Sequence, residues 1–123
     1  MAKIILDTNI LIEILKNNQD TIKAVEQYSR HYISVVTKME LFYGALNKQE
    51  TLKLKKFLDL FEVIDIDKNI SALADNLIYT YAKSHTLNIP DGLIAATSII
   101  SKIPLFTYNT KDFKYINNII LYT

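Results

Sequence analysis

The side chains best suited to chemistry carry oxygen and either follow predicted strands or open predicted helices. They are Asp7, Glu40, Asp91, Asn109 and Asp112. Carboxylates gathered at one place repel one another and raise each other's pKa, so a fold needs a cation to hold several of them together. Oxygen ligands without nearby His or Cys favour Mg²⁺ or Mn²⁺ over zinc. Since such ions activate water and stabilise charge on a phosphoryl group, these residues predict hydrolysis of a phosphate ester or diester.

Each acid also has a purely structural explanation. An acid in the first turn of a helix gains about 0.3–1 kcal/mol from the helix dipole, which is enough to explain Asp91 alone. Glu40 ends the pattern Thr37-Lys38-Met39-Glu40, which matches a capping box and predicts a helix starting at Thr37. Taken singly, the structural explanations are the commoner ones, and only the joint pattern favours a metal site.

The elements that must position these residues alternate along the chain. We expect strands at 4–6, 32–36, 63–66, 104–107 and 119–122, and helices at 10–16, 20–30, 37–46, 51–61, 70–82 and 91–101. The alternation predicts a three-layer α/β/α fold in which helices cover both faces of a central parallel sheet of about five short strands. In such a sheet the reactive crevice lies beyond the carboxyl ends of the strands, at the topological switch point. The acids that follow the strands should meet there.

Length and composition narrow the function further. The 123 residues predict a single domain over 1–123, and 50% hydrophobic with 22% charged residues is typical of a globular protein. The absence of cysteine excludes a disulfide framework, a thiolate metal site and a cysteine nucleophile. A net charge of +1 means that any contact with nucleic acid has to be local. With no apolar stretch long enough for a signal peptide or a membrane span, we expect a cytoplasmic protein without membrane contact.

Four segments together resemble the PIN-domain family, specifically its VapC type. They are Ile4-Ile5-Leu6-Asp7-Thr8-Asn9, Thr37-Lys38-Met39-Glu40-Leu41 with Gly44, Ile89-Pro90-Asp91-Gly92-Leu93-Ile94-Ala95-Ala96-Thr97, and Thr107-Tyr108-Asn109-Thr110-Lys111-Asp112-Phe113. They occur in the family's order and span essentially the whole chain. The first motif alone is weak, the last two are fairly specific, and the four together are strong.

The resemblance implies a PIN-like fold and a metal-dependent endoribonuclease that leaves 5′-phosphate and 3′-hydroxyl ends. It implies Asp7, Glu40 and Asp91 as ligands of Mg²⁺, with Mn²⁺ as an alternative. Asn109 and Asp112 complete the implied catalytic set. The family often has Asp where Asn109 stands, so this chain lacks one negative charge and the binding of a second metal stays open.

Two further residues are implied to act behind the carboxylates. Asn9 and Thr107 resemble residues that orient carboxylates or a bound water.

The resemblance also implies partners. As the toxin of a toxin–antitoxin pair, the chain would bind an antitoxin whose tail occupies the groove. The sequence has only one arginine and no recognisable RNA-reading module, which favours structured RNA such as tRNA or a ribosomal loop over arbitrary messenger RNA. We also expect a homodimer, because the amphipathic helices carry more aromatic surface than one small core needs. These aromatic residues are Phe42, Tyr43, Phe57, Phe61, Tyr79 and Tyr81.

The sequence also leaves different functions open. His31 and His85 could cut RNA without metal, although structural histidines are much commoner. Lysines in 53–56 and 111–114 could hold phosphates, although lysines on amphipathic helices usually only solvate a surface. A PIN-like RNA-processing nuclease without an antitoxin, a phospho-acceptor receiver domain using Asp65 or Asp67, and an inert binding domain are compatible with the chain as well. The receiver is disfavoured because no acidic pair follows the first strand, and we expect Asp65 and Asp67 to be strand-edge and N-cap residues.

Overall fold

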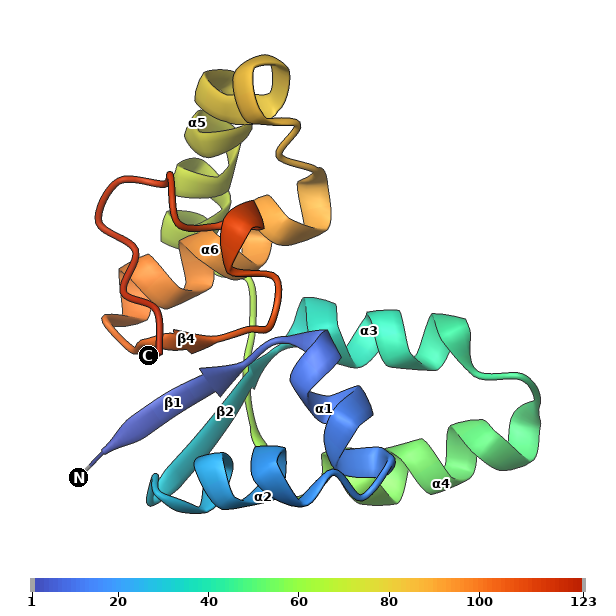
Figure 1. The fold of residues 1–123 in the computed structure, drawn as a ribbon. Coiled ribbons are helices and arrows are strands. Elements are labelled where there is room, and N and C mark those ends of the chain that lie inside the picture. Colours follow the sequence, from blue (N-terminus) through green and yellow to red (C-terminus); the bar gives the residue numbers. More distant parts are fainter. Residues whose placement is uncertain (1, 123) are drawn as a thin grey trace.

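Four parallel strands form one sheet in the computed structural model, which describes residues 2–122. β1 (Lys3–Leu6), β2 (Arg30–Ser34), β3 (Glu62–Ile64) and β4 (Leu105–Phe106) lie in the order β3-β2-β1-β4. The helices are α1 (Thr8–Leu15), α2 (Gln19–Glu26), α3 (Val35–Gly44), α4 (Lys48–Leu58), α5 (Lys68–His85) and α6 (Ile89–Ser101), followed by the 3₁₀ turn η1 (Thr110–Asp112). Figure 1 shows α5 and α6 on one side of the sheet and α1, α2 and α4 on the other. The predicted α/β fold with a parallel sheet between helices is confirmed.

The fifth strand expected at 119–122 is wrong. Leu121 makes only an isolated parallel bridge with Leu105. The backbone bonds around it run from Leu105 N to Ile120 O at 2.9 Å and from Tyr122 N to Leu105 O at 2.8 Å. Because β4 is itself only two residues long, it offers too few backbone groups for a longer ladder.

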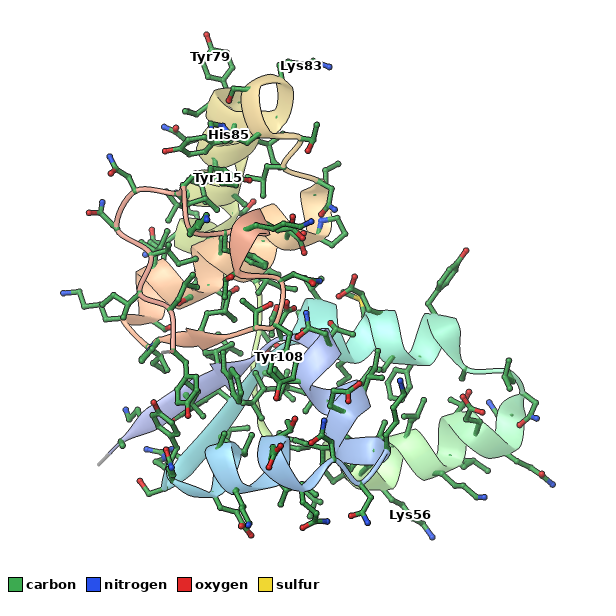
Figure 2. The ribbon with its side chains drawn as sticks, viewed as in Figure 1. Lys56, Tyr79, Lys83, His85, Tyr108 and Tyr115 are labelled. Atoms are coloured by element: carbon green, nitrogen blue, oxygen red, sulfur yellow. The ribbon has the colours of Figure 1, made fainter. Side chains whose placement is uncertain are left out.

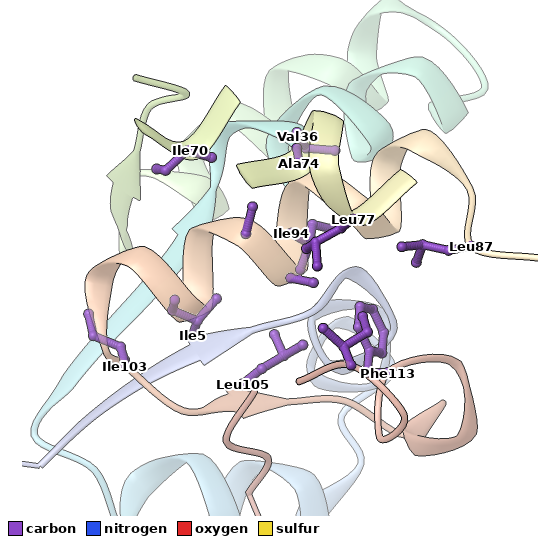
Figure 3. Close-up of a cluster of buried hydrophobic side chains, with 13 residues drawn as sticks. Ile5, Val36, Ile70, Ala74, Leu77, Leu87, Ile94, Ile103, Leu105 and Phe113 are labelled. Atoms are coloured by element: carbon purple, nitrogen blue, oxygen red, sulfur yellow. The ribbon is translucent and has the colours of Figure 1, made fainter. Parts of the chain in front are cut away.

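Side chains of β1 alternate between two cores, as a strand with helices on both faces requires. Ile5 packs with α5, α6 and Leu105, in the cluster that Figure 3 shows. Ile4 and Leu6 pack on the opposite face against α1, α2 and α4. Ile4, Ile5 and Leu6 are fully buried, so the strand that leads to Asp7 is packed on both faces.

The helix after β2 begins two residues earlier than predicted. Ser34 is the N-cap of α3, and its hydroxyl accepts a hydrogen bond from Val36 N at 3.1 Å. The expected capping box starting at Thr37 is therefore wrong, because Thr37 and Glu40 lie inside the helix. β2 also lies two residues earlier than predicted, since it covers Arg30–Ser34 and not 32–36.

The order of the strands places a topological switch point beside β1. The chain passes from β1 to β2 on one side and returns later to β4 on the other side. The connection from β1 to β2, with α1 and α2, therefore covers one face of the sheet, and the connection to β4, with α5 and α6, covers the other. Connections that diverge in this way leave a crevice at the carboxyl ends of β1 and β4. No helix among residues 2–122 is long and apolar enough to cross a membrane.

Candidate active site

A crevice of about 230 Å³ lies at the carboxyl ends of β1 and β4. It is lined by Asp7, Thr8, Asn9, Ile12, Glu40, Asp91 and Asn109. Four of the five predicted catalytic residues are therefore brought together here from four chain segments. Asp112 does not line the crevice, but its charge is close enough to raise the pKa of both Asp7 and Asp91.

Asp7 is buried, and its carboxylate is hydrogen-bonded to the start of α1 and to the residue that follows β4. One carboxylate oxygen accepts from Thr8 N at 2.8 Å, which makes Asp7 the N-cap of α1. The other accepts from Thr107 Oγ1 at 2.8 Å and from Asn9 Nδ2 at 3.2 Å. Burial raises the pKa of Asp7, while the three hydrogen bonds lower it and the charge of Asp112 raises it further. The net direction is upward, so this carboxylate would gain from a nearby cation.

Asn9, Thr107 and the backbone after β4 form a network around Asp7. Asn9 Nδ2 also donates to Thr107 Oγ1 at 3.2 Å, and Thr107 Oγ1 accepts from Asn109 N at 3.1 Å. Asn9 Oδ1 accepts from Tyr108 N at 3.0 Å. The start of α1 and the end of β4, almost a hundred residues apart in sequence, are thereby locked together.

Glu40 reaches the crevice through a residue that sequence reasoning missed. Thr8 Oγ1 donates to Glu40 Oε1 at 2.7 Å and lies 3.2 Å from Thr37 Oγ1, which is fully buried. The only sequence signal for this role was a hydroxyl residue directly after Asp7. Glu40 is exposed and takes no part in capping α3. The purely structural explanation of Glu40, as the last residue of a capping box, is therefore wrong.

Asp91 stands in the first turn of α6, and its backbone N–H donates to the N-cap Asn88 at 2.9 Å. Its pKa is raised from 3.8 to about 6, first by burial and then by the charges of Asp7, Asp112 and Glu40. A first-turn acid stabilised only by the helix dipole would show the opposite shift. The raised pKa thus reflects the burial of Asp91 first and the other carboxylates around the crevice second.

The donor set fits a hard divalent cation. The lining residues provide carboxylate, amide and hydroxyl oxygens and no basic side chain. Within residues 2–122, no three acidic or histidine side chains stand close enough to enclose an ion by themselves. Mg²⁺ commonly binds through one or two carboxylates and keeps several waters, so an open arrangement of this kind suits it better than a closed cage would.

The two histidines lie elsewhere. His31 Nε2 is 2.9 Å from Val25 O, and His85 stacks on Tyr115 with ring centroids 4.1 Å apart. Figure 2 shows Tyr115 next to His85, which is the last residue of α5. Neither histidine lines the crevice. Metal-free acid–base cleavage would need both of them beside the scissile phosphate, so the structure does not support that alternative.

The receiver alternative also lacks its acceptor. Asp67 is the N-cap of α5 and accepts from Ile70 N at 2.8 Å, as predicted, and neither Asp65 nor Asp67 lines the crevice.

Comparison with known proteins agrees with this geometry. Residues 4–118 match the PIN domain family. The chain belongs to the PIN-domain family. It is 32% identical over 115 residues to "Ribonuclease VapC1" of Methanocaldococcus jannaschii, covering 92% of this chain and 80% of that protein. It is 31% identical to "Ribonuclease VapC" of Rickettsia bellii, covering 92% of this chain and 90% of that protein.

Solved PIN-domain structures share the arrangement of elements. The VapBC2 structure from Rickettsia felis, bound to a DNA fragment from its promoter, aligns with a TM-score of 0.81 and 31% identity over 98% of this chain and 97% of that one. A toxin–antitoxin complex from Klebsiella pneumoniae aligns with a TM-score of 0.79 and 30% identity over 98% and 96%. The VapC-type resemblance carried by the four sequence motifs is thus confirmed.

Proposed function

We propose that this protein is a divalent-metal-dependent endoribonuclease and the toxin of a toxin–antitoxin pair. The observation that carries the proposal is the crevice in which Asp7, Glu40 and Asp91 meet, with the pKa of Asp91 raised to about 6 partly by the other acids. Relatives named as VapC ribonucleases support RNA as the substrate. The activity would take place in the cytoplasm, where RNA is abundant.

In this proposal Asp7, Glu40 and Asp91 would hold Mg²⁺, or Mn²⁺ in its place, directly or through waters bound to the ion. The ion would neutralise the carboxylates, activate water and stabilise charge on the phosphate. Thr107 and Asn9 orient Asp7, and Thr8 orients Glu40, through the hydrogen bonds described above.

Asn109 and Asp112 complete the proposed catalytic set at the rim. Asn109 lines the crevice. Asp112 lies outside the lining, and its charge raises the pKa of Asp91. Asn109 adds an amide oxygen without charge, which favours occupancy by a single metal.

Cleavage of RNA by the purified protein tests the function. We expect cleavage with Mg²⁺ or Mn²⁺, none in EDTA, and none from Asp91→Asn. Undiminished cleavage in EDTA would remove the metal from the mechanism, and cleavage confined to DNA would remove the ribonuclease assignment. An inert domain or a receiver would cleave neither.

An apolar groove adjoins the crevice and supports an antitoxin as partner. Thr8, Ile12 and Glu40 line both the crevice and this groove, which runs between α1, α3 and α4. The groove also contains Leu15, Leu41, Gly44, Glu50 and Leu54. An antitoxin tail with apolar side chains in this groove would reach the carboxylates directly. Similar structures are themselves toxin–antitoxin complexes.

We propose structured RNA, such as tRNA or a ribosomal loop, as the substrate. The single arginine, Arg30, is paired with Glu62 at 2.7 Å and so is not available to a phosphate at the crevice. Sequencing the 5′ ends of RNAs made on induction in cells would identify the cut sites. Cuts scattered over all messages without a common structure would contradict this choice.

A further inference from the structure

Tyr108 lies in the chain between two residues of the site, although it does not itself line the crevice. Thr107 before it contacts Asp7, and Asn109 after it lines the crevice. Its side chain is 49% exposed although it follows the buried strand β4. Figure 2 shows Tyr108 near the middle of the molecule, whereas Tyr79 projects from the far end of α5.

Three contacts hold Tyr108 in place. Its backbone N–H donates to Asn9 Oδ1 at 3.0 Å, and its hydroxyl hydrogen-bonds the buried hydroxyl of Thr21 in α2. Its ring makes a T-shaped contact with Phe106 at a centroid distance of 5.4 Å. Because the hydroxyl is already bonded to a buried partner, the ring is the part of the side chain left to contact a ligand.

This fixation distinguishes Tyr108 from the other highly exposed tyrosines. Tyr43 and Tyr79 are 94% and 91% exposed and lie on α3 and α5, whereas the backbone of Tyr108 is bonded to Asn9, which lines the crevice. A ring that is already ordered loses little conformational entropy when a ligand covers it. Tyr108 is therefore the tyrosine best prepared to bind a flat partner next to the site.

The charges at the crevice create a need for an uncharged source of affinity. Apart from the proposed metal ion, the crevice offers a phosphate no positive charge, because carboxylates and no basic side chain line it. Stacking of a nucleobase on an aromatic ring does not depend on charge or on the identity of the base.

We propose that Tyr108 is the stacking platform for an unpaired nucleobase beside the scissile phosphate. This specificity role rests on the proposed ribonuclease function. It favours substrates in which the nucleotide next to the cut is unpaired, as in the loop of a structured RNA.

Binding of a short single-stranded ribo-oligonucleotide that contains 2-aminopurine tests the proposal, because stacking quenches the fluorescence of this base. The full chain carrying Asp7→Asn, to prevent cleavage, is compared with the same chain carrying Tyr108→Ala, Tyr108→Phe or Tyr79→Ala in addition. We expect Tyr108→Ala to lose the quenching and to weaken binding about 5- to 150-fold. Tyr108→Phe should keep most of both, because the ring and its contact with Phe106 remain although the bond to Thr21 is lost. Tyr79→Ala should match the parent.

Cleavage kinetics of the same substitutions without Asp7→Asn separate this proposal from the ribonuclease proposal. Tyr108→Ala should raise KM with little change in kcat, whereas loss of a metal ligand lowers kcat. Quenching and KM unchanged in Tyr108→Ala would overturn the stacking role while leaving the ribonuclease intact. An equal loss in Tyr108→Ala and Tyr79→Ala would also overturn it, since the effect would not belong to the crevice.

Discussion

Asp7 combines an N-cap with a buried charge, and the two roles can be separated by substitution. Asn also caps helices well, so Asp7→Asn should keep the cap of α1 while removing the repulsion from Asp112 and the cost of burying a charge. We expect this variant to lose RNA cleavage and to melt at or slightly above the wild-type temperature. Asp7→Ala should lose RNA cleavage and also the cap of α1, and the missing cap should lower the stability by about 0.5–2 kcal/mol. If Asp7→Asn instead melted far below the wild type in circular dichroism, Asp7 would be a structural residue.

Asp91 predicts how stability depends on pH in the metal-free protein. Its pKa in the fold, about 6, lies above the ordinary 3.8, so the fold favours the protonated form. This contribution to stability is complete below about pH 4 and is lost as the pH rises through 6. The loss is at most about 3 kcal/mol and less in practice, because Asp91 is partly exposed.

The measurement for Asp91 is the melting temperature in EDTA between pH 4 and 7. Asp91→Asn should show a smaller decline over this range, and saturating Mg²⁺ should reduce the decline in the wild type. Identical profiles for Asp91→Asn and wild type would show that the carboxylate is not crowded in solution.

At the scale of elements, the start of α3 decides where Glu40 points. Ser34 is fully buried and accepts from Val36 N, so Ser34→Ala should destabilise the protein by about 1 kcal/mol. Glu40→Gln should leave stability nearly unchanged, because Glu40 does not cap the helix. Denaturant unfolding measures both. A larger loss from Glu40→Gln than from Ser34→Ala would restore the capping box at Thr37.

At the scale of the whole molecule, the exposed apolar residues predict self-association. Leu46, Leu60, Tyr43 and Tyr79 are each at least 75% exposed, more than a small monomer usually leaves uncovered. We expect a homodimer in light scattering at micromolar concentration. Tyr43→Glu and Tyr79→Glu, on α3 and α5, would show which face is involved. A monodisperse wild-type monomer would contradict the prediction.

The sequence by itself determined that the first strand is covered on both faces and that Asp7 directly follows it. Ile4, Ile5 and Leu6 without polar alternation predicted a strand buried on both faces, and all three are fully buried. Asp67 was expected to be an N-cap and is one. These features depend on residue type and on neighbours close in sequence, which is why local patterns were sufficient to predict them.

Only the tertiary structure decided which groups face one another. The bond from Thr8 to Glu40 spans 32 residues and that from Thr107 to Asp7 spans 100, and no local pattern contains such a distance. The fifth strand failed for the same reason, because pairing depends on the length of its partner β4 and not on the apolar residues of 119–122. Asp112 shows the limit of sequence patterns. Its position after the fourth strand predicted that it would join the other acids, but it does not line the crevice and affects Asp91 only through its charge. Local sequence sets the backbone preferences, while strand order and side-chain direction follow from packing between distant segments.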